Sequence, residues 1–368
     1  MSRRKNLISN VIYLTLTMAS LFLAILVCNN RYSETTFSAL LKFAVGGIIA
    51  GVINTFAHEL GHYFAGKKNG FVFSSMVVWF FKWSKVKNKI RFDFVILGEE
   101  AGYTEMIPAS KENLDIRLKN MTRGGLIMSF IMMLVGIPPF FIQGLSAWVY
   151  CLWSAFLPVG IYFFFGNFLP MINEGVCNDG AVYSGIKNKE DTMVVVLNLL
   201  AIQAEMYEGK TPSEVDGSLY FNVPQLPEDD LNFIALLNAR YNYYLDKEDY
   251  VEAKKVSDRL MTLLDYMPKA YKFAVQTDAL YNACTFDFNE DTADDLTYEI
   301  EKYLNNVNTA LTVRAKLAYL AGVKGEKDGL DIFYKKGVKE ADRCQIKGYG
   351  AFERKLFEML KQKYQING

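Results

Sequence analysis

Long apolar runs interrupt the charged sequence in the first half of the chain, and helical periodicity replaces them in the second half. Four of these runs are long enough to cross a hydrocarbon core of about 30 Å as a helix. They extend from about Leu7 to Cys28, from about Phe37 to Ala65, from Gly124 to Ile142 and from Ala147 to about Met171. The pattern predicts four transmembrane helices.

The first run follows the basic residues Arg3, Arg4 and Lys5, as in a secretory signal peptide. Its apolar stretch is long, however, and no small-x-small cleavage site follows it. We therefore expect a retained signal anchor.

Basic residues predict the orientation of the four helices. The segment from Gly66 to Arg123 is rich in lysine and arginine, which is typical of a cytoplasmic loop. The turn from Gln143 to Ser146 carries no charge and fits the outer side. Four crossings then place both termini, and everything after about Asn173, in the cytoplasm.

Two strands are expected within that loop, at Phe71 to Phe81 and Lys89 to Leu97, because both segments are rich in Val, Phe, Ile and Trp. The charged residues from Lys82 to Lys89 separate them. Such a hairpin either covers the helix ends and faces the membrane, or exposes an edge that pairs with an extended peptide.

Helical periodicity dominates from about Ile186 onward. The expected helices are Asp191–Glu208, Asp229–Leu245, Tyr250–Tyr266, Ala270–Cys284, Ala293–Asn305, Asn308–Lys324, Lys327–Lys336 and Gln345–Tyr364. Leu237, Tyr244 and Ala253 resemble one tetratricopeptide-type hairpin, but no clean 34-residue repeat continues it. We expect a degenerate helical-repeat domain that binds a partner or a substrate tail, or shields the cytoplasmic face of a site.

Composition and charge exclude some classes of function. The chain has 40 basic and 40 acidic residues, and this balance argues against a nucleic-acid partner, which would favour a basic excess. Its five cysteines form no CxxC pair, which argues against a disulfide framework or a cysteine zinc finger. The chain has two histidines, His58 and His62.

Both histidines lie in the motif His58-Glu59-Leu60-Gly61-His62, at the end of the second apolar run. Positions i and i+4 share one helical face, so both imidazoles can bind one tetrahedral zinc ion. Glu59 can then accept a proton from the water that zinc activates. Two histidines placed at random fall four residues apart only about once in 180 trials. The motif therefore predicts a catalytic zinc site.

Catalytic zinc usually has three protein ligands, and the third must here be a carboxylate or a thiolate. The fourth apolar run ends in a compact polar cluster that offers Glu174, Cys177 and Asp179. Gly180 follows Asp179 and permits a close backbone approach. Asn54, one helical turn before His58 on the same face, is a hydrogen-bond donor to a residue of the site, a substrate contact, or a polar residue that bonds a neighbouring helix.

These motifs, from about Leu40 to Ser184, resemble the site-2 protease family of intramembrane zinc metalloproteases. The resemblance lies in His58-Glu59-Leu60-Gly61-His62 and, about 100 residues later, in an N-x-x-P and D-G segment. It implies that His58, His62 and Asp179 bind zinc and that Glu59 is the general base. It also implies that Asn167 and Pro170 border the substrate-entry region. Gly102-Tyr103 is similar to a Gly-Tyr segment of that family. The stretch from Pro170 to Asp179 is longer than in familiar members, so Glu174 stays an alternative third ligand.

The sequence therefore predicts a mainly α protein with two domains. Residues 1–185 form a polytopic transmembrane metalloprotease domain with a small cytoplasmic β segment, and residues 186–368 form a helical cytoplasmic domain. The expected activity is zinc-dependent cleavage of a membrane-embedded protein or peptide, in or near its transmembrane segment. The alternatives are a membrane-anchored zinc protease for soluble cytoplasmic peptides and a non-catalytic adaptor. The lysine-, isoleucine- and asparagine-rich composition hints at a bacterial plasma membrane.

Overall fold

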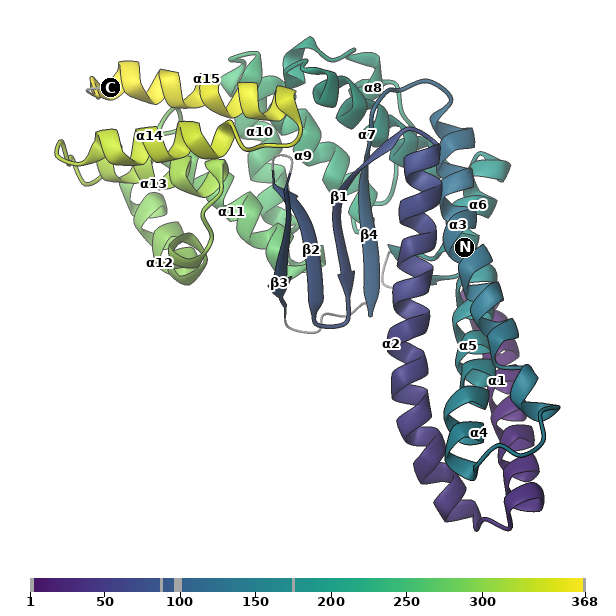
Figure 1. The fold of residues 1–368 in the computed structure, drawn as a ribbon. Helices are drawn as coiled ribbons and strands as arrows, with labels where there is room; N and C mark the ends of the chain where they lie inside the picture. The colour runs from purple at the N-terminus through teal and green to yellow at the C-terminus, as the bar shows by residue number, and fades with distance from the viewer. Residues whose placement is uncertain (1–2, 87–88, 96–100, 174–175, 367–368) are drawn as a thin grey trace. The chain divides into compact units, whose positions relative to one another are not determined.

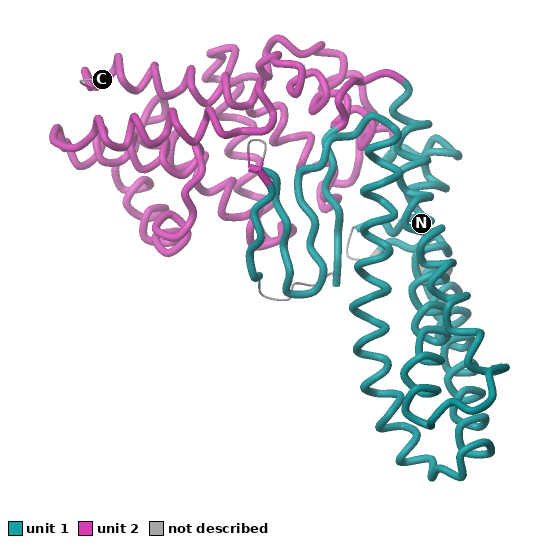
Figure 2. Tube along the Cα trace, in the orientation of Figure 1, with its two compact units in different colours: residues 1–85, 90–107, 113–193 teal, residues 86–89, 108–112, 194–368 magenta. Residues whose placement is uncertain are grey.

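The computed structural model describes residues 3–86, 89–95, 101–173 and 176–366, which form a mainly helical protein with a small sheet (Figure 1). Contacts divide it into two compact units (Figure 2). The first comprises residues 1–85, 90–107 and 113–193, and the second comprises residues 86–89, 108–112 and 194–368.

Four apolar helical segments dominate the first unit. Its helices are α1 (Arg3–Tyr32), α2 (Thr36–Lys68), α3 (Leu114–Val135), α4 (Ala147–Ser154), α5 (Phe156–Phe168) and α6 (Asp179–Asn188). The segments long and apolar enough to cross a membrane are Asn6–Tyr32, Thr36–Lys68, Leu114–Phe140 and Ala147–Phe168. Large apolar side chains such as Phe22, Phe37 and Ile48 are exposed on them.

Helices α2 and α3 approach closely at a pair of glycines. A β carbon on Gly61 would lie 2.3 Å from the carbonyl oxygen of Gly124, and one on Gly124 would lie 2.2 Å from the carbonyl oxygen of Gly61. Only residues without a β carbon allow this crossing. The crossing brings the His58–His62 face of α2 against α3.

The third and fourth helices differ from the ranges expected from the sequence. Helix α3 begins at Leu114 rather than Gly124, because the charged segment before Gly124 buries Leu114 and Leu118 on one face of a continuing helix. The fourth segment divides into α4 and α5 around Ala155. Pro158 has no amide hydrogen to donate to the preceding turn, which accounts for the interruption.

The sheet has four strands rather than the two expected: β1 (Phe71–Val78), β2 (Phe81–Val86), β3 (Lys89–Phe94) and β4 (Gly102–Pro108). Their order is β3-β2-β1-β4, and β1 pairs antiparallel with β2 so that Ser75 faces Ser84. The segment expected to be a charged linker is therefore β2 itself. Phe81 and Trp83 alternate there with Lys82 and Ser84, and this period of two suits a strand. Strand β4 lies at the edge of the sheet, beside α2 (Figure 1).

A two-stranded pair, β5 (Ile172–Asn173) and β6 (Val176–Cys177), precedes α6. It occupies the stretch that lengthens the interval between Pro170 and Asp179.

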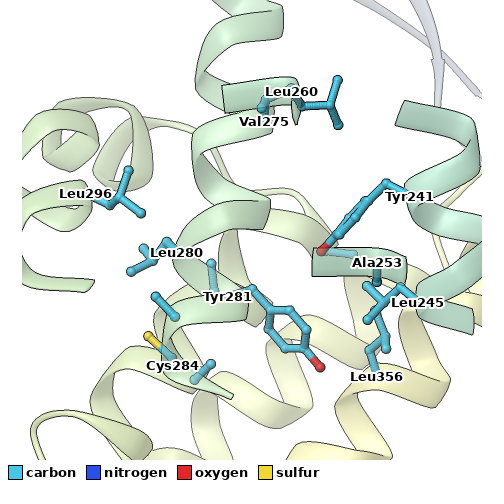
Figure 3. Close-up of a cluster of buried hydrophobic side chains, with 14 of the residues drawn as sticks. Tyr241, Leu245, Ala253, Leu260, Val275, Leu280, Tyr281, Cys284, Leu296 and Leu356 are labelled. Atoms are coloured by element: carbon cyan, nitrogen blue, oxygen red, sulfur yellow. The ribbon is translucent and has the colours of Figure 1, made fainter. Parts of the chain in front are cut away.

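The second unit is an array of helices around one apolar core. After α7 (Asp191–Glu208) come α8 (Ser218–Phe221), α9 (Leu231–Asp246), α10 (Tyr250–Thr262), α11 (Lys269–Cys284), α12 (Glu290–Asn306), α13 (Ala310–Gly322), α14 (Leu330–Ala341) and α15 (Lys347–Tyr364). Short 3-10 turns lie at Pro212–Glu214 and Leu264–Tyr266, and another, Pro138–Phe140, follows α3 in the first unit. The core includes Tyr241, Leu245, Ala253, Leu280 and Leu356 (Figure 3). The expected helices correspond to these except that α8 was not expected, that α10 ends at Thr262 and a 3-10 turn follows it, and that α14 continues five residues beyond Lys336.

A buried ion-pair network crosses this core. The Arg314 guanidinium, fully buried, donates hydrogen bonds to Glu353 Oε2 and Asp278 Oδ1, each 2.9 Å away. It also lies over the ring of Tyr281, 4.2 Å from the centroid. Three helices, α11, α13 and α15, are thereby joined by one cation.

Candidate metal centre

His58 and His62 lie on one face of α2 and are both buried. Their Nε2 atoms are 3.1 Å apart, and their rings are perpendicular. The i, i+4 spacing places the two imidazoles one above the other, as expected for a shared helical face. Because this relationship is local, it depends only on α2 being helical.

Asp179 begins α6 and brings its carboxylate to the same place. Its Oδ2 atom lies 3.2 Å from Nε2 of His58 and 3.2 Å from Nε2 of His62. Ligands of a tetrahedral zinc with bonds of about 2.0–2.1 Å are separated by about 3.4 Å. The three atoms therefore have the spacing of ligands around one ion.

Hydrogen bonds on the far side of each imidazole orient the two rings. Nδ1 of His62 lies 3.1 Å from the carbonyl oxygen of Met121. A carbonyl only accepts, so Nδ1 carries the hydrogen, and Nε2 of the neutral ring keeps its lone pair. Nδ1 of His58 lies 2.8 Å from the hydroxyl of Ser129, which is compatible with the same tautomer.

With both rings in this tautomer, three lone-pair donors converge with no hydrogen between them. Asp179 Oδ2 is buried and has no hydrogen-bond donor among the described residues. Three such atoms repel one another unless a cation lies between them. This arrangement fits a metal ion, and nitrogen and carboxylate ligands suit zinc.

Gly125 of α3 leaves room beside the ligand atoms. A β carbon there would lie 2.4 Å from Nε2 of His62 and 2.8 Å from Cε1 of His58. Any larger residue would displace the imidazoles. The glycine thus maintains a small space on the side of α3.

The side chain of Asn178 fixes the position of Asp179. As the N-cap of α6, its Oδ1 accepts hydrogen bonds from the amides of Ala181 and Met171, 2.9 and 3.0 Å away. Its Nδ2 donates to the carbonyl oxygens of Gly166 and Leu169, each 2.7 Å away. The side chain therefore joins the start of α6 to the end of α5.

Gly180 allows that junction to close. A β carbon on it would lie 2.2 Å from the carbonyl oxygen of Phe168 in α5. This is the close backbone approach that the glycine after Asp179 led us to expect.

Glu59 is buried next to the cluster, 4% exposed. Its Oε2 accepts a hydrogen bond of 2.7 Å from the hydroxyl of Thr104 on β4. A carboxylate beside a metal site can accept and return a proton.

The other candidate residues lie apart from the ligand atoms. Among the described residues, the group whose ligand atoms lie within 4.8 Å of one another is His58, His62 and Asp179. Cys177 lies in β6, outside that group. Glu174, the alternative third ligand, is outside the described residues.

Asn54, Asn167 and Pro170, the residues expected near the substrate, lie in different environments. Asn54 is fully buried; its Nδ2 donates to the carbonyl oxygen of Ala50, and its Oδ1 has no partner among the described residues. Asn167 Nδ2 donates within α5, to the carbonyl oxygen of Phe163. Pro170 follows the end of α5, where Leu169 is extended.

Sequence reasoning did not identify Thr104, Ser129, Asn178 or Gly125. A signal existed only for Asn178, since asparagine directly before an acidic residue and glycine is typical of a helix N-cap. The other three act through contacts between distant segments.

No protein-family model matches the chain, and neither the curated proteins nor the solved structures include one with significant similarity to it.

Proposed function

We propose that the chain is an intramembrane zinc metalloendopeptidase. One observation carries the proposal: two imidazole nitrogens and a carboxylate oxygen converge within 3.1–3.2 Å, and the two histidines and a buried glutamate beside them lie on a helix apolar enough to cross a membrane. His58, His62 and Asp179 would hold the ion. A structural zinc usually has four protein ligands and no use for a neighbouring base.

The bilayer setting is part of the proposal. Four apolar helices support a multi-pass membrane protein, and the lysines and arginines between residues 66 and 123 support a cytoplasmic location for that segment and for both termini. A bacterial plasma membrane fits the composition. Two histidines and a glutamate at the end of an apolar helix are costly unless they face a metal or a water-filled cavity.

The chain's own residues would act as follows. Bound zinc supplies Lewis acidity, which polarises a carbonyl and lowers the pKa of water. Glu59 accepts the proton that the attacking water loses and gives it to the amine of the leaving peptide, so one water is consumed for each bond cleaved. The Nδ1 contact to the Met121 carbonyl oxygen keeps His62 in the tautomer that binds a cation, and the contact between Ser129 and His58 Nδ1 orients the second ring and is compatible with the same tautomer.

Metal content tests the ligand set. The detergent-purified full chain should hold one zinc per molecule by mass spectrometry, and Asp179→Ala should lose it. Glu174→Ala, the matched acidic control, should keep it, and so should Glu59→Gln. Zinc retained by Asp179→Ala would reject Asp179 as a ligand.

Cleavage tests the activity. A panel of single-span reporters, each with fluorescent proteins on both sides of one apolar segment, would be reconstituted with the enzyme in liposomes. We expect Glu59→Gln to abolish cleavage while keeping zinc. Cleavage of the soluble flanks alone would favour a membrane-anchored protease for cytoplasmic peptides. A wild-type protein without zinc would favour a non-catalytic adaptor that binds partners through its helical domain.

A further inference from the structure

Thr104 connects strand β4 to the carboxylate of Glu59. Its hydroxyl oxygen lies 2.7 Å from Glu59 Oε2 and 3.2 Å from the backbone carbonyl oxygen of the same residue. An ionised carboxylate and a carbonyl only accept, so the hydroxyl is the donor. It has one hydrogen, and the shorter contact indicates that this hydrogen points at Oε2.

The second oxygen of Glu59 is in a different environment. Among the described residues no hydrogen bond reaches Oε1, and the nearby Gly102 has no side chain. A β carbon at Gly102 would lie 3.2 Å from Oε1 and 2.5 Å from Cγ2 of Thr55. Thr104 therefore binds Oε2, and Gly102 leaves space beside Oε1. These two residues of β4 give the two carboxylate oxygens different surroundings.

Contacts within the sheet hold strand β4 in place next to Glu59. The carboxylate of Glu105, the next residue, accepts hydrogen bonds from the hydroxyls of Ser74 and Ser75 on β1, at 3.2 and 2.9 Å. Met106 and Ile107 are buried. Because the sheet anchors the residues after Thr104, the hydroxyl has a defined position relative to α2.

We propose that Thr104 is a positioning residue for the general base. By holding Oε2, it fixes the rotation of the Glu59 carboxylate and leaves Oε1 as the oxygen that exchanges the proton. The proposal rests on the proposed function, since it requires Glu59 to act as the base. A glutamate side chain has three rotatable bonds, and orienting it in advance removes a cost that would otherwise fall on the reaction.

The test compares Thr104→Val, which keeps the shape and removes the hydroxyl, with Thr104→Ser, which keeps the hydroxyl. Thr122→Val is the matched control: that buried hydroxyl donates only to the Leu118 carbonyl oxygen within α3, 2.9 Å away. The probe is a peptide hydroxamate, a zinc chelator whose N–O–H group shares its hydrogen with a carboxylate beside the metal. Its Kd would be measured on zinc-loaded, detergent-purified full chain, together with the zinc content.

We expect Thr104→Val to weaken hydroxamate binding about tenfold, in line with the loss of a hydrogen bond to a charged group. Glu59→Gln should weaken it at least as much. Thr104→Ser and Thr122→Val should bind as the wild type does, and all four variants should hold one zinc. On any reporter that the wild type cleaves, Thr104→Val should lower kcat about tenfold with little change in KM, because the ground-state contacts with the substrate stay intact.

Contrary outcomes separate the two proposals. Wild-type binding by Thr104→Val, with weak binding by Glu59→Gln, overturns the role of Thr104 and leaves the proposed function standing. Loss of zinc from Thr104→Val, or equal weakening in Thr104→Ser, reduces Thr104 to a structural residue. Wild-type binding by Glu59→Gln removes the base itself, and the proposed function with it.

Discussion

The hydroxyl oxygen of Ser129 lies 2.8 Å from Nδ1 of His58, and both side chains are buried. The contact joins α3 to the imidazole on the side opposite the converging ligand atoms. Outer partners of this kind fix the orientation of a metal-binding histidine and raise its basicity.

We therefore expect Ser129→Ala to lower zinc affinity about 10- to 100-fold, the range typical for loss of such a partner. Competition with a chromogenic chelator measures this. The control is Ser154→Ala, another buried serine, whose hydroxyl donates to the carbonyl oxygen of Tyr150 within its own helical segment. Equal zinc affinity in Ser129→Ala and the wild type would show that the contact is dispensable.

Gly125→Ala should prevent metal binding without harming the helix. Its β carbon would lie 2.4 Å from Nε2 of His62, so the imidazole must move away from the other ligand atoms. Alanine otherwise favours a helix over glycine by about 1 kcal/mol. Gly47→Ala on α2 is the matched control, because a β carbon there meets nothing within 4 Å. Zinc stoichiometry measures metal binding, and thermal unfolding measures the stability of the fold. Full zinc loading of Gly125→Ala would contradict the expectation.

Asn178→Ala should both destabilise the protein and weaken the metal centre. It removes the N-cap of α6, at a cost of about 1–2 kcal/mol, and frees the start of α6 from the end of α5. Asp179 then loses its fixed position, so zinc affinity should fall as well. Asn188→Ala is the control at the other end of α6, where the exposed side chain donates a hydrogen bond to the hydroxyl of Ser184. Unchanged zinc affinity in Asn178→Ala would show that the N-cap is not needed to position Asp179 for zinc binding.

The buried Arg314 network should give the second unit an unusual pH dependence. Burial, together with the charge of Glu353, raises the pKa of Asp278 to about 6 despite the attraction of Arg314. An acid whose folded pKa exceeds its unfolded value contributes stability that is complete below about pH 4 and is lost as the pH rises through 6. Asp278→Asn keeps an oxygen for Arg314 and removes this titration.

The thermal midpoint of Asp278→Asn should therefore rise relative to the wild type between pH 4 and pH 7. Asp294→Asn is the control: its difference from the wild type should stay constant over this range and shrink only at lower pH. Hydrogen bonds from Lys324 and Tyr319 lower the pKa of the Asp294 carboxyl, so its contribution is present above its unfolded pKa and is lost in acid. A constant difference between Asp278→Asn and the wild type across this range would mean that Asp278 does not titrate there.

Most helices of this protein, and the pairing of its two histidines, follow from residues that are close together in the sequence. The apolar runs predict the four long helical segments, because length and hydropathy are properties of one contiguous stretch. The pairing of His58 with His62 follows from the helical repeat of α2 alone. In the second unit, periodicity predicts most helices for the same reason, and α7 has the predicted limits, Asp191–Glu208.

Only the tertiary structure decided the relationships between distant segments. The sequence left Glu174, Cys177 and Asp179 open as the third ligand, and the packing of α6 against α5 through Asn178 and Gly180 is what brings Asp179 to the histidines. Thr104 and Ser129 lie 45 and 71 residues from Glu59 and His58, the residues they contact. Strand β2 was not predicted because Lys82 and Lys85, together with Lys87 and Lys89 that follow, are typical of a charged linker, and only the pairing with neighbouring strands shows that the segment is a strand. A contact between distant segments depends on how helices and strands pack, and no local pattern of side chains encodes that packing.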